Sequence, residues 1–243
     1  GGIVLGLPSD ENKVELETKA FNYMPTFGTP PTTNATNAQL ITIAQLATHT
    51  SGFEKADSAV TGLAADITVT PGTVWKYSDA GLNWLPDVLT FVYQQDLAVL
   101  AEQKVWSVLG LRGAAATGDD VRWRVNLQRP PTRDGGTLQY RELASGITAN
   151  ANAMARVGLL FLRNGDWNGT RVLSEDFIVN QVRKPLPQNA SLPVVPDRAS
   201  ERYPNAQTDY GILWWTNKSK TMPNVPEDAF WAWGLGEELI VVI

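Results

Sequence analysis

The chain has 243 residues, of which 43% are hydrophobic and 19% are charged, a composition that is typical of a globular protein and excludes disorder over its whole length. Its 20 Lys and Arg residues against 25 Asp and Glu residues give a net charge of −5, and because no basic block interrupts this balance we expect no nucleic-acid groove. The chain has no cysteine and a single histidine, His49, which excludes disulfides, thiolate zinc sites, a cysteine nucleophile and any site that needs two imidazoles.

Hydrophobic spacing predicts the elements in chain order, and Gly, Pro and helix-capping residues mark where they begin and end. We expect a surface loop over 29–38, a short helix from Ile41 that stops at Gly52, a helix from Asp79 that Pro86 kinks or restarts, and a helix over Leu97–Leu109. A capped helix over Asn150–Leu162 and a capped helix start at Ser174 follow. The predicted strands are Val121–Leu127, Tyr210–Thr216 and Leu239–Ile243.

Neither end of the chain is typical of a natural domain. It opens on Gly1–Leu5 without an initiator Met, and it closes on the apolar run Glu238–Ile243. A domain seldom stops within a strand, because the unpaired edge is adhesive, so we expect a piece of a longer protein. No apolar run approaches the length of about 20 residues that a membrane span requires, so no membrane span is expected.

Five short strings carry more information than the composition does. They lie at 43–53 (IAQLATHTSGF), 71–82 (PGTVWKYSDAGL), 109–111 (LGL), 142–147 (ELASGI) and 210–215 (YGILWW). Each is similar to a motif of the serine β-lactamase-like hydrolases, and they occur in the order of that family. The family includes class C β-lactamases, D-alanyl-D-alanine carboxypeptidases, esterases and 6-aminohexanoate-oligomer hydrolases.

The resemblance implies an α+β fold, in which helices flank an antiparallel sheet. Residues 1–243 would form one β-lactamase-like domain that is incomplete at both ends. A mostly helical subdomain would span roughly 40–185, and sheet elements would lie at roughly 208–243. The resemblance to this family, together with the absence of cysteine, also favours an extracytoplasmic location, whereas the oligomeric state stays open.

The first catalytic element that the resemblance implies is a nucleophilic serine with a lysine three residues later. No serine of this chain has a lysine at that spacing. In the family this pair precedes the region that matches Gly2–Leu5. We therefore expect the nucleophile upstream of residue 1, and we expect the 243 residues alone to be inactive.

The second element is Tyr-x-Asn, which Tyr77-Ser78-Asp79 resembles. It implies that Tyr77 is a catalytic base: a phenol with a pKa of about 10 is a poor base, but neighbouring ammonium groups favour its phenolate. The alternative is a half-buried aromatic side chain before a helix. Asp79 stands where the family has Asn, and an ionised carboxylate accepts hydrogen bonds but donates none. Its alternative role is that of an acid at a helix N-terminus.

The third element is a strand entry that binds substrate, for which the candidates are Trp233, Gly234, Leu235 and Gly236. Leu235 stands where some members have His, so no cation is present to hold a substrate carboxylate. This favours a neutral ester or amide over β-lactams and peptides. The alternative is a Trp-rich core strand.

His49 is expected to be a structural hydrogen-bonding residue. The rival interpretation is a triad in which His49 activates Ser51, but two residues apart within one helix end the side chains would not face each other. Four Asn-x-Ser/Thr triplets, at Asn34, Asn168, Asn189 and Asn217, are attributed to chance in an Asn-rich chain.

The sequence thus predicts part of a serine hydrolase that transfers the acyl group of a small-molecule ester or amide through an acyl-enzyme. It predicts no metal and no organic cofactor. The rival hypothesis is a non-catalytic binding protein that has kept the fold, and it is favoured by Asp79 and by the missing cation.

Overall fold

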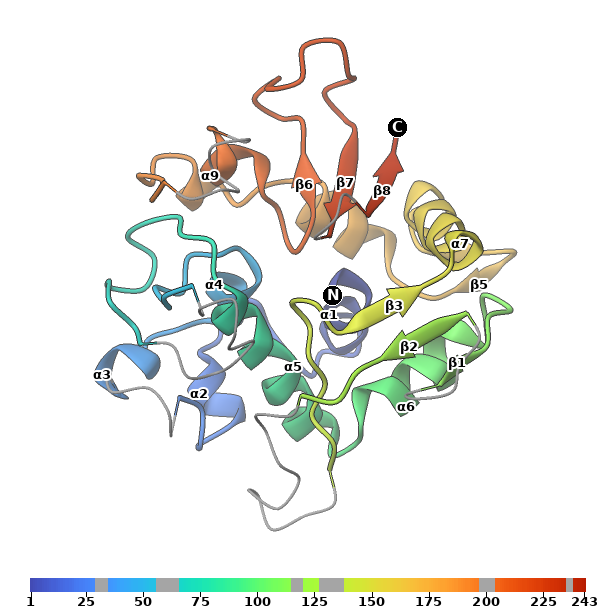
Figure 1. The fold of residues 1–243 in the computed structure, drawn as a ribbon, viewed down its shortest axis with the longest axis horizontal. Helices are drawn as coiled ribbons and strands as arrows, with labels where there is room; N and C mark the ends of the chain where they lie inside the picture. The colour runs from blue at the N-terminus through green and yellow to red at the C-terminus, as the bar shows by residue number, and fades with distance from the viewer. Residues whose placement is uncertain (29–34, 56–65, 115–119, 127–137, 197–203, 235–237) are drawn as a thin grey trace.

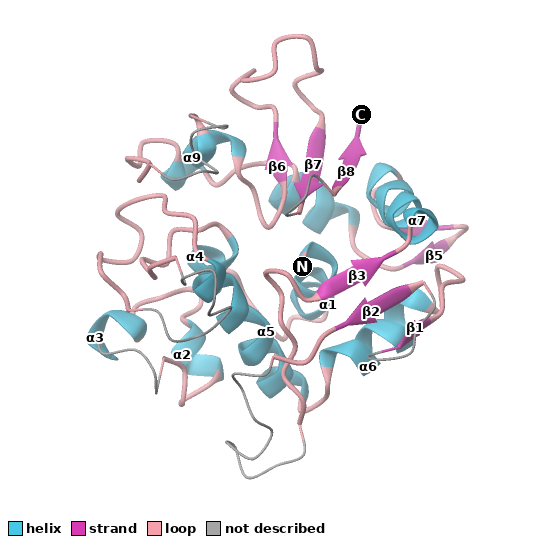
Figure 2. Cartoon of the chain, in the orientation of Figure 1, coloured by secondary structure: helices cyan, strands magenta, loops and turns pink. Residues whose placement is uncertain are grey.

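The computed structural model describes residues 1–28, 35–55, 66–114, 120–126, 138–196, 204–234 and 238–243. Helices and short strands surround a helix, α1, whose N-terminal end lies near the middle of the molecule in Figure 1. Figure 2 shows that the strands gather in small sheets with helices beside them. The predicted α+β class is confirmed.

Helix α1 (Gly2–Asp10) is buried from Gly2 to Pro8. Its residues are apolar on every side, which is the pattern of a helix enclosed by other elements rather than of one at a surface. Gly6 permits the closest approach: a Cβ at this position would lie 2.7 Å from Leu173 Cδ2 and 2.8 Å from Phe177 Cε1. Any other residue there would therefore displace the Leu173 and Phe177 side chains.

Two helices position the segments that carry the motifs. Helix α4 (Ile43–Ala47) begins at a capping box, in which the Thr42 hydroxyl and the Gln45 side chain each accept from the other residue's backbone N–H. Helix α5 (Asp79–Tyr93) begins at Ser78, whose Oγ accepts from the Gly81 N–H, and it continues through Pro86.

The remaining helices are shorter or irregular, apart from α7 (Ala151–Leu162), which Asn150 caps as predicted. They comprise α2 (Ala20–Tyr23), α3 (Ala35–Ala38), α6 (Leu97–Ala101), π-helices at Glu102–Trp106 and Phe177–Val182, a 3₁₀ turn at Pro187–Asn189, and α9 (Ala206–Asp209).

The described strands form three small sheets. In the first, β2 (Val121–Trp123) pairs in parallel with β1 (Gly113–Ala114) and antiparallel with β3 (Ile147–Ala149). The second is the hairpin of β4 (Asp166–Trp167) and β5 (Thr170–Arg171). In the third, the strands run antiparallel in the order β6 (Trp215–Thr216), β7 (Phe230–Trp233) and β8 (Leu239–Val242).

The third sheet has two different buried faces, because successive strand residues point to opposite sides. One face joins the large hydrophobic core, and its residues are Phe230, Ala232, Ile240 and Val242. The other face packs into a smaller group of rings, Trp75, Tyr210, Trp215 and Trp231, which we call the aromatic cluster. The sheet thus separates the main core from the aromatic cluster.

Four sequence predictions need correction. The strand expected over Tyr210–Thr216 is reduced to Trp215–Thr216, because the chain folds back so that Tyr210 bridges Trp215, with Leu213 at a φ of 61°. The helix expected over Leu97–Leu109 is α helical only to Ala101 and then widens to a π-helix. The loop expected over 29–38 contains the short helix α3, and the strand expected over Val121–Leu127 ends at Trp123.

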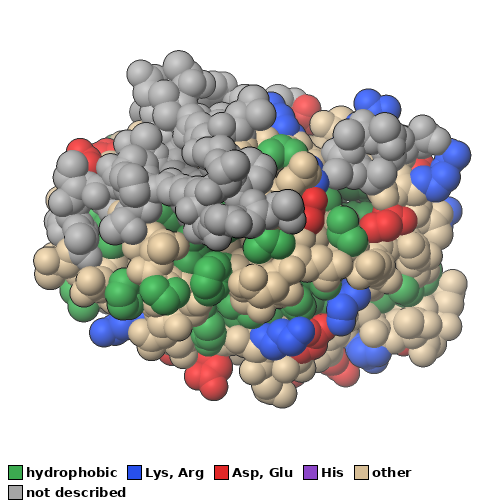
Figure 3. Space-filling model, turned by 90° about the horizontal axis from the view of Figure 1, so that it is seen from below, with side chains coloured by type: hydrophobic (Ala, Val, Ile, Leu, Met, Phe, Trp, Pro, Cys, Tyr) green, Lys and Arg blue, Asp and Glu red, His purple; other side chains and the backbone are tan. Residues whose placement is uncertain are grey.

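The surface carries mixed charge. On the face in Figure 3, the described Lys and Arg side chains lie among Asp, Glu and apolar side chains. Among the described residues, no helix has the length and hydrophobicity to cross a bilayer. No group of three His, Cys, Asp or Glu side chains in those parts of the chain is arranged to hold a metal ion.

Candidate active site

The segment before α5 is fixed by the residue that caps the helix. Ser78 Oγ accepts from the Gly81 N–H at 3.1 Å and donates to the Glu54 carbonyl at 2.9 Å. Tyr77 therefore immediately precedes the cap, and Asp79 is the first helical residue. Both side chains are half-buried, so they border the protein interior without being enclosed by it.

His49 lies directly against this segment. Its ring stacks on that of Tyr77, with the centroids 4.3 Å apart and an interplanar angle of 26°. The imidazole is 1% exposed, and its Nδ1 accepts from the Ser78 N–H at 3.1 Å. No hydrogen bond joins His49 to Ser51 in the structure, and the Nδ1 lone pair is already used by Ser78. The Ser51–His49 triad therefore has no support in this geometry.

Burial determines the charge of His49. Burial first, and then the positive charge of Lys55, together lower the pKa of the imidazole to about 3, against the hydrogen bond from Ser78, which raises it. His49 is therefore neutral at neutral pH. Because Nδ1 accepts a hydrogen bond, the ring proton resides on Nε2.

The aromatic cluster brings the second and third motifs together. Tyr210 contacts Trp215 edge to face at 4.7 Å between centroids, and Trp75 lies 6.0 Å from Trp215. Tyr77 and Trp233 both pack against this cluster, Trp233 at 6.4 Å from Trp215. Tilted and edge-to-face pairs of this kind hold rings in fixed orientations, so two residues that are distant in sequence border one rigid platform.

Charged groups surround Tyr77. The Lys55 ammonium lies over its ring, 5.0 Å from the centroid. Lys76 pairs with Glu54, and hydrogen bonds from Lys76 and Thr68 hold the pKa of the Glu54 carboxyl below its usual value. These contacts attach the segment before residue 56 to the Tyr77 loop.

Asp79 contributes a negative charge beside the aromatic cluster. Burial raises the pKa of the Tyr210 phenol, and the charge of Asp79 raises it further. Tyr210 therefore keeps its proton at any physiological pH. Lys55 lies in none of the five motif strings, and Tyr210 begins the fifth string, but no sequence spacing places either residue here, because both reach the site through the fold.

Asn83, one helical turn after Asp79, joins α5 to the segment that contains ELASGI. Its Oδ1 accepts from the backbone N–H groups of Leu143 and Ala144 at 2.9 and 3.0 Å. The start of α1 lies close by: a Cβ on Gly1 would be 3.1 Å from a Leu213 methyl and 3.4 Å from a Leu143 methyl. Several of the motif segments therefore converge around α5 and the first residues of α1.

The third predicted element is only partly described. Trp233 ends β7, where it pairs with Leu239, and the Gly234 N–H donates to the Glu238 carbonyl at 2.8 Å. Leu235 and Gly236 lie outside the described residues.

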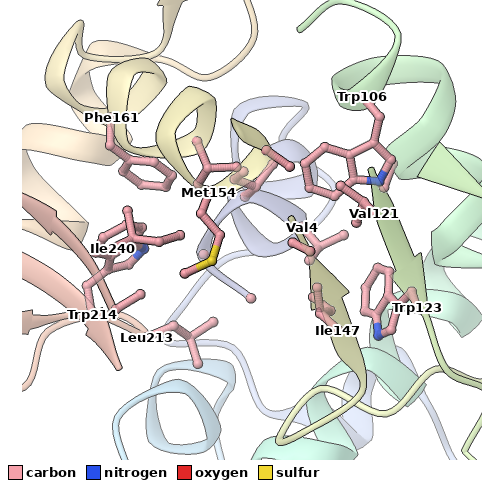
Figure 4. A pocket seen from close by; sticks show the side chains of 18 residues that line it. Val4, Trp106, Val121, Trp123, Ile147, Met154, Phe161, Leu213, Trp214 and Ile240 are labelled. Atoms are coloured by element: carbon pink, nitrogen blue, oxygen red, sulfur yellow. The ribbon is translucent and has the colours of Figure 1, made fainter. Parts of the chain in front are cut away.

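A cavity of about 150 Å³ lies at the N-terminal end of α1, between the first sheet, α7 and β8. In Figure 4, Met154 reaches from α7 toward its middle, with Trp106 and Trp123 on one side and Phe161 and Trp214 on the other. No charged side chain is among the residues that line it. A cavity of this size can accept a group about the size of benzene.

The sequence profile of the Beta-lactamase family matches residues 2–233. No curated protein matches the chain significantly in sequence. Several solved structures share the fold. One from Bacteroides dorei, assigned as a beta-lactamase, superposes with a TM-score of 0.71 at 15% identity and covers 99% of this chain and 70% of its own.

Two further structures have different assignments. One from Bacillus anthracis, assigned as a 6-aminohexanoate-dimer hydrolase, has a TM-score of 0.67 at 18% identity, with 99% of this chain and 63% of its own covered. A family VIII carboxylesterase has a TM-score of 0.63 at 16% identity, and the match covers 100% of this chain and 71% of the carboxylesterase. The chain spans less than two thirds of the second structure's length. With a profile match over nearly all of its length and this shared fold, the chain belongs to the Beta-lactamase family of serine hydrolases.

Proposed function

We propose that this chain is the larger part of a serine hydrolase that cleaves a neutral ester or amide through an acyl-enzyme. The observation that carries the proposal is the meeting of two motifs: Tyr77, before α5, and Trp233, at the end of β7, pack against the same aromatic cluster. A site for acyl transfer needs a proton-transfer group close to a strand on which substrate can lie, and this arrangement supplies both.

Tyr77 is the proposed base. It takes the proton of the attacking serine while the serine oxygen bonds to the substrate carbonyl carbon. The Lys55 ammonium over the ring, together with the lysine of a Ser-x-x-Lys pair, favours the phenolate. The proton then passes to the leaving alcohol or amine, and water releases the acyl group by the reverse sequence. Backbone N–H groups at the end of β7 are the proposed donors to the oxyanion.

The nucleophile is proposed to lie in a segment that precedes Gly1. Two facts support this placement: no serine of the chain has a lysine three residues later, and the chain spans 63% to 71% of the three structures compared above. We refer below to the chain together with this preceding segment as the longer protein.

The substrate is proposed to be neutral. Leu235 stands at the position where some members of the family have a cation. A substrate carboxylate would lose its hydration there without gaining a partner. β-Lactams and D-alanyl peptides carry such a carboxylate, so esters and simple amides fit better.

A non-catalytic binding protein is the second candidate. It is favoured by Asp79, because a carboxylate in place of the amide cannot donate a hydrogen bond to a substrate carbonyl. The two candidates differ in one cheap observation, which is whether the longer protein reacts with a fluorophosphonate probe. Stoichiometric labelling supports the hydrolase, and no labelling of the folded longer protein supports the binding protein.

The experiment on mechanism is the replacement Tyr77→Phe in the longer protein, assayed with p-nitrophenyl esters. We expect kcat to fall by roughly 10²–10⁴, the usual contribution of general acid–base catalysis. The matched control is Tyr93→Phe, which also removes one hydroxyl, here one that donates to Glu11 at 3.1 Å. Unchanged turnover in Tyr77→Phe would exclude the proposed base. Labelling of residues 1–243 alone would exclude the proposed position of the nucleophile.

A further inference from the structure

We propose that His49 is a positioning residue: it orients Tyr77 and the start of α5, and it exchanges no proton with substrate. The catalytic consequence rests on the proposed role of Tyr77, but the structural claim does not. His49 is the only histidine of the chain, so its protonation state can be observed without interference from other imidazoles.

Three consecutive residues are held by this one side chain and its backbone. The Lys76 N–H donates to the His49 carbonyl at 2.8 Å, and the Ser78 N–H donates to His49 Nδ1 at 3.1 Å. Between them, the Tyr77 ring stacks on the imidazole at 4.3 Å. Bonds to residues on both sides of Tyr77 fix its backbone, and the stack fixes the plane of its ring.

Through Ser78, the contacts of His49 also position the start of α5. This residue caps the helix with its Oγ and donates to the Glu54 carbonyl. The bond from Ser78 N–H to His49 therefore places the cap, and with it Asp79 in the first turn. A shift of about 1 Å in such groups reduces turnover by about 10²-fold in enzymes generally.

The hydrogen bond from the Ser78 N–H to His49 Nδ1 requires a neutral imidazole. Protonated His49 would present an N–H toward the Ser78 N–H, so the bond would be replaced by two opposed donors. The groups that face His49 are the Tyr77 and Tyr210 phenols, the Trp75 ring and the Lys55 charge, with Asp79 beside Tyr210. Burial and Lys55 both disfavour the imidazolium, so the acceptor is preserved over the working range of pH.

Residue 49 occupies this position at a cost. Its φ is 59°, a left-handed conformation that is uncommon for residues other than glycine, although Asn, Asp and His adopt it more often than other residues do. Its Nε2 is buried and has no hydrogen-bond partner among the described residues. A strained backbone and an unused buried polar atom are retained where the surrounding structure depends on them. Here the dependent structure is the Tyr77 loop.

The first experiment uses the 243-residue chain labelled with ¹⁵N-histidine and observed by NMR. We expect one imidazole, protonated on Nε2 and unprotonated on Nδ1, that does not titrate between pH 5 and 8. The variant Tyr77→Leu should shift the ring proton signals of His49, because the stacked ring is lost. Titration near pH 6.5 with mixed tautomers would overturn the proposal.

The second experiment separates the side-chain bond from the backbone bond by amide hydrogen exchange. In His49→Phe, which keeps a ring but removes the acceptor, Ser78 N–H exchange should accelerate by about tenfold, the equivalent of one hydrogen bond. Lys76 N–H exchange should not change, because its acceptor is the His49 carbonyl. In His49→Asn, which tolerates the positive φ and offers an oxygen near the position of Nδ1, Ser78 should stay protected. Equal exchange of Ser78 in all three proteins would overturn the proposal.

The third experiment measures turnover of p-nitrophenyl esters by the longer protein. His49→Asn removes the stack, so kcat should fall by about 10–100-fold while KM stays within about twofold. The control is Thr48→Val, which removes a buried hydroxyl bonded to the Ala44 carbonyl without touching residues 76–78. Equal kcat in the His49→Asn variant and the parent would overturn the positioning role. Wild-type turnover in Tyr77→Phe would instead refute the proposed role of Tyr77 as the base, and the hydrogen-exchange result would still decide whether His49 positions the Tyr77 loop.

Discussion

The main core and the aromatic cluster lie on opposite faces of the same sheet but differ in composition. The main core is mostly aliphatic, with Phe161, Trp214 and Phe230 among its rings. The aromatic cluster consists of indole and phenol rings and is bordered by His49, Lys55 and Asp79. Adjacent residues serve different regions, since Trp214 packs in the core and Trp215 in the cluster. The comparison indicates that one face of the sheet closes the main core, while the other carries the rings that border the proposed site.

The largest expected effect is on the core face. Phe161→Ala removes a fully buried ring that lies 4.4 Å from Trp214 and 6.4 Å from Phe230, so the free energy of unfolding should fall by about 3–5 kcal/mol. Trp233→Ala, on the other face and half-buried, should cost less than half of this. Urea denaturation measures both. A larger loss in Trp233→Ala than in Phe161→Ala would contradict the division of roles.

The next largest effect is a loss of folding stability in acid, and it arises from His49 beside the aromatic cluster. The pKa of His49 is lowered to about 3 in the folded protein, whereas an unfolded histidine titrates near pH 6.5. Between these values the unfolded state binds the proton and the folded state does not, so stability falls as the pH decreases from about 6.5 to about 3. At about 1.4 kcal/mol per pH unit, His49 should lower the free energy of unfolding by about 3 kcal/mol between pH 6.5 and pH 4.5.

His49→Asn is the control for this acid effect, because it lacks the titrating group and keeps a residue that tolerates the backbone conformation. Its unfolding free energy should decrease less between pH 6.5 and 4.5 than that of the parent. Parallel pH profiles of the two proteins would show that His49 is accessible to protons in the folded state.

A smaller effect is expected from Asp79→Asn. The carboxylate lies in the first turn of α5, where an acid stabilises a helix by about 0.3–1 kcal/mol. The free energy of unfolding should therefore change by no more than this amount. In the longer protein the loss of a negative charge from the cluster border should shift the pH–rate profile and improve amide turnover. An unchanged profile with unchanged amide turnover would reduce Asp79 to a helix-start acid.

The smallest effect is expected from replacing Val241 in β8, which tests whether the outer face of this strand is exposed to solvent. In β8, Val241 is 50% exposed and the adjacent Val242 is 3% exposed. Val241→Thr should therefore alter the unfolding free energy by less than about 0.5 kcal/mol, whereas Val242→Thr buries a hydroxyl and should cost about 1–3 kcal/mol. Equal costs, measured by thermal denaturation, would show that another surface covers the outer face of β8.

Local signals predicted the elements that depend on local chemistry. The Asn150 cap and the apolar stripe of α7 were sufficient for that helix, and the Thr42 region gave α4. Helix α1 was not predicted, because its residues are apolar on all sides and include Pro8, so no amphipathic period marks it. The fold-back between Tyr210 and Trp215 was missed because Leu213 adopts a left-handed φ of 61°, a conformation that its residue type does not indicate.

The candidate site was predictable only where a motif names the residue. Tyr77 and Asp79 were identified from their string, and their catalytic roles stay predictions, as do those of Trp233, Gly234, Leu235 and Gly236. The stack of His49 on Tyr77 joins two strings that no spacing rule relates. Lys55 likewise reaches Tyr77 only because Glu54 pairs with Lys76 and fixes the segment. Contacts that arise from tertiary packing cannot be read from one sequence.

The alternating faces of β7 have a consequence for how sequences of this family diverge. Phe230 and Ala232 pack with the main core, whereas Trp231 and Trp233 pack with the aromatic cluster, which borders the proposed site. Mutations at the second pair can therefore change the shape of the platform while the first pair keeps the protein folded. Under the proposed function, substitutions at every second residue of β7 would alter the substrate-binding platform and leave the packing of the main core unchanged.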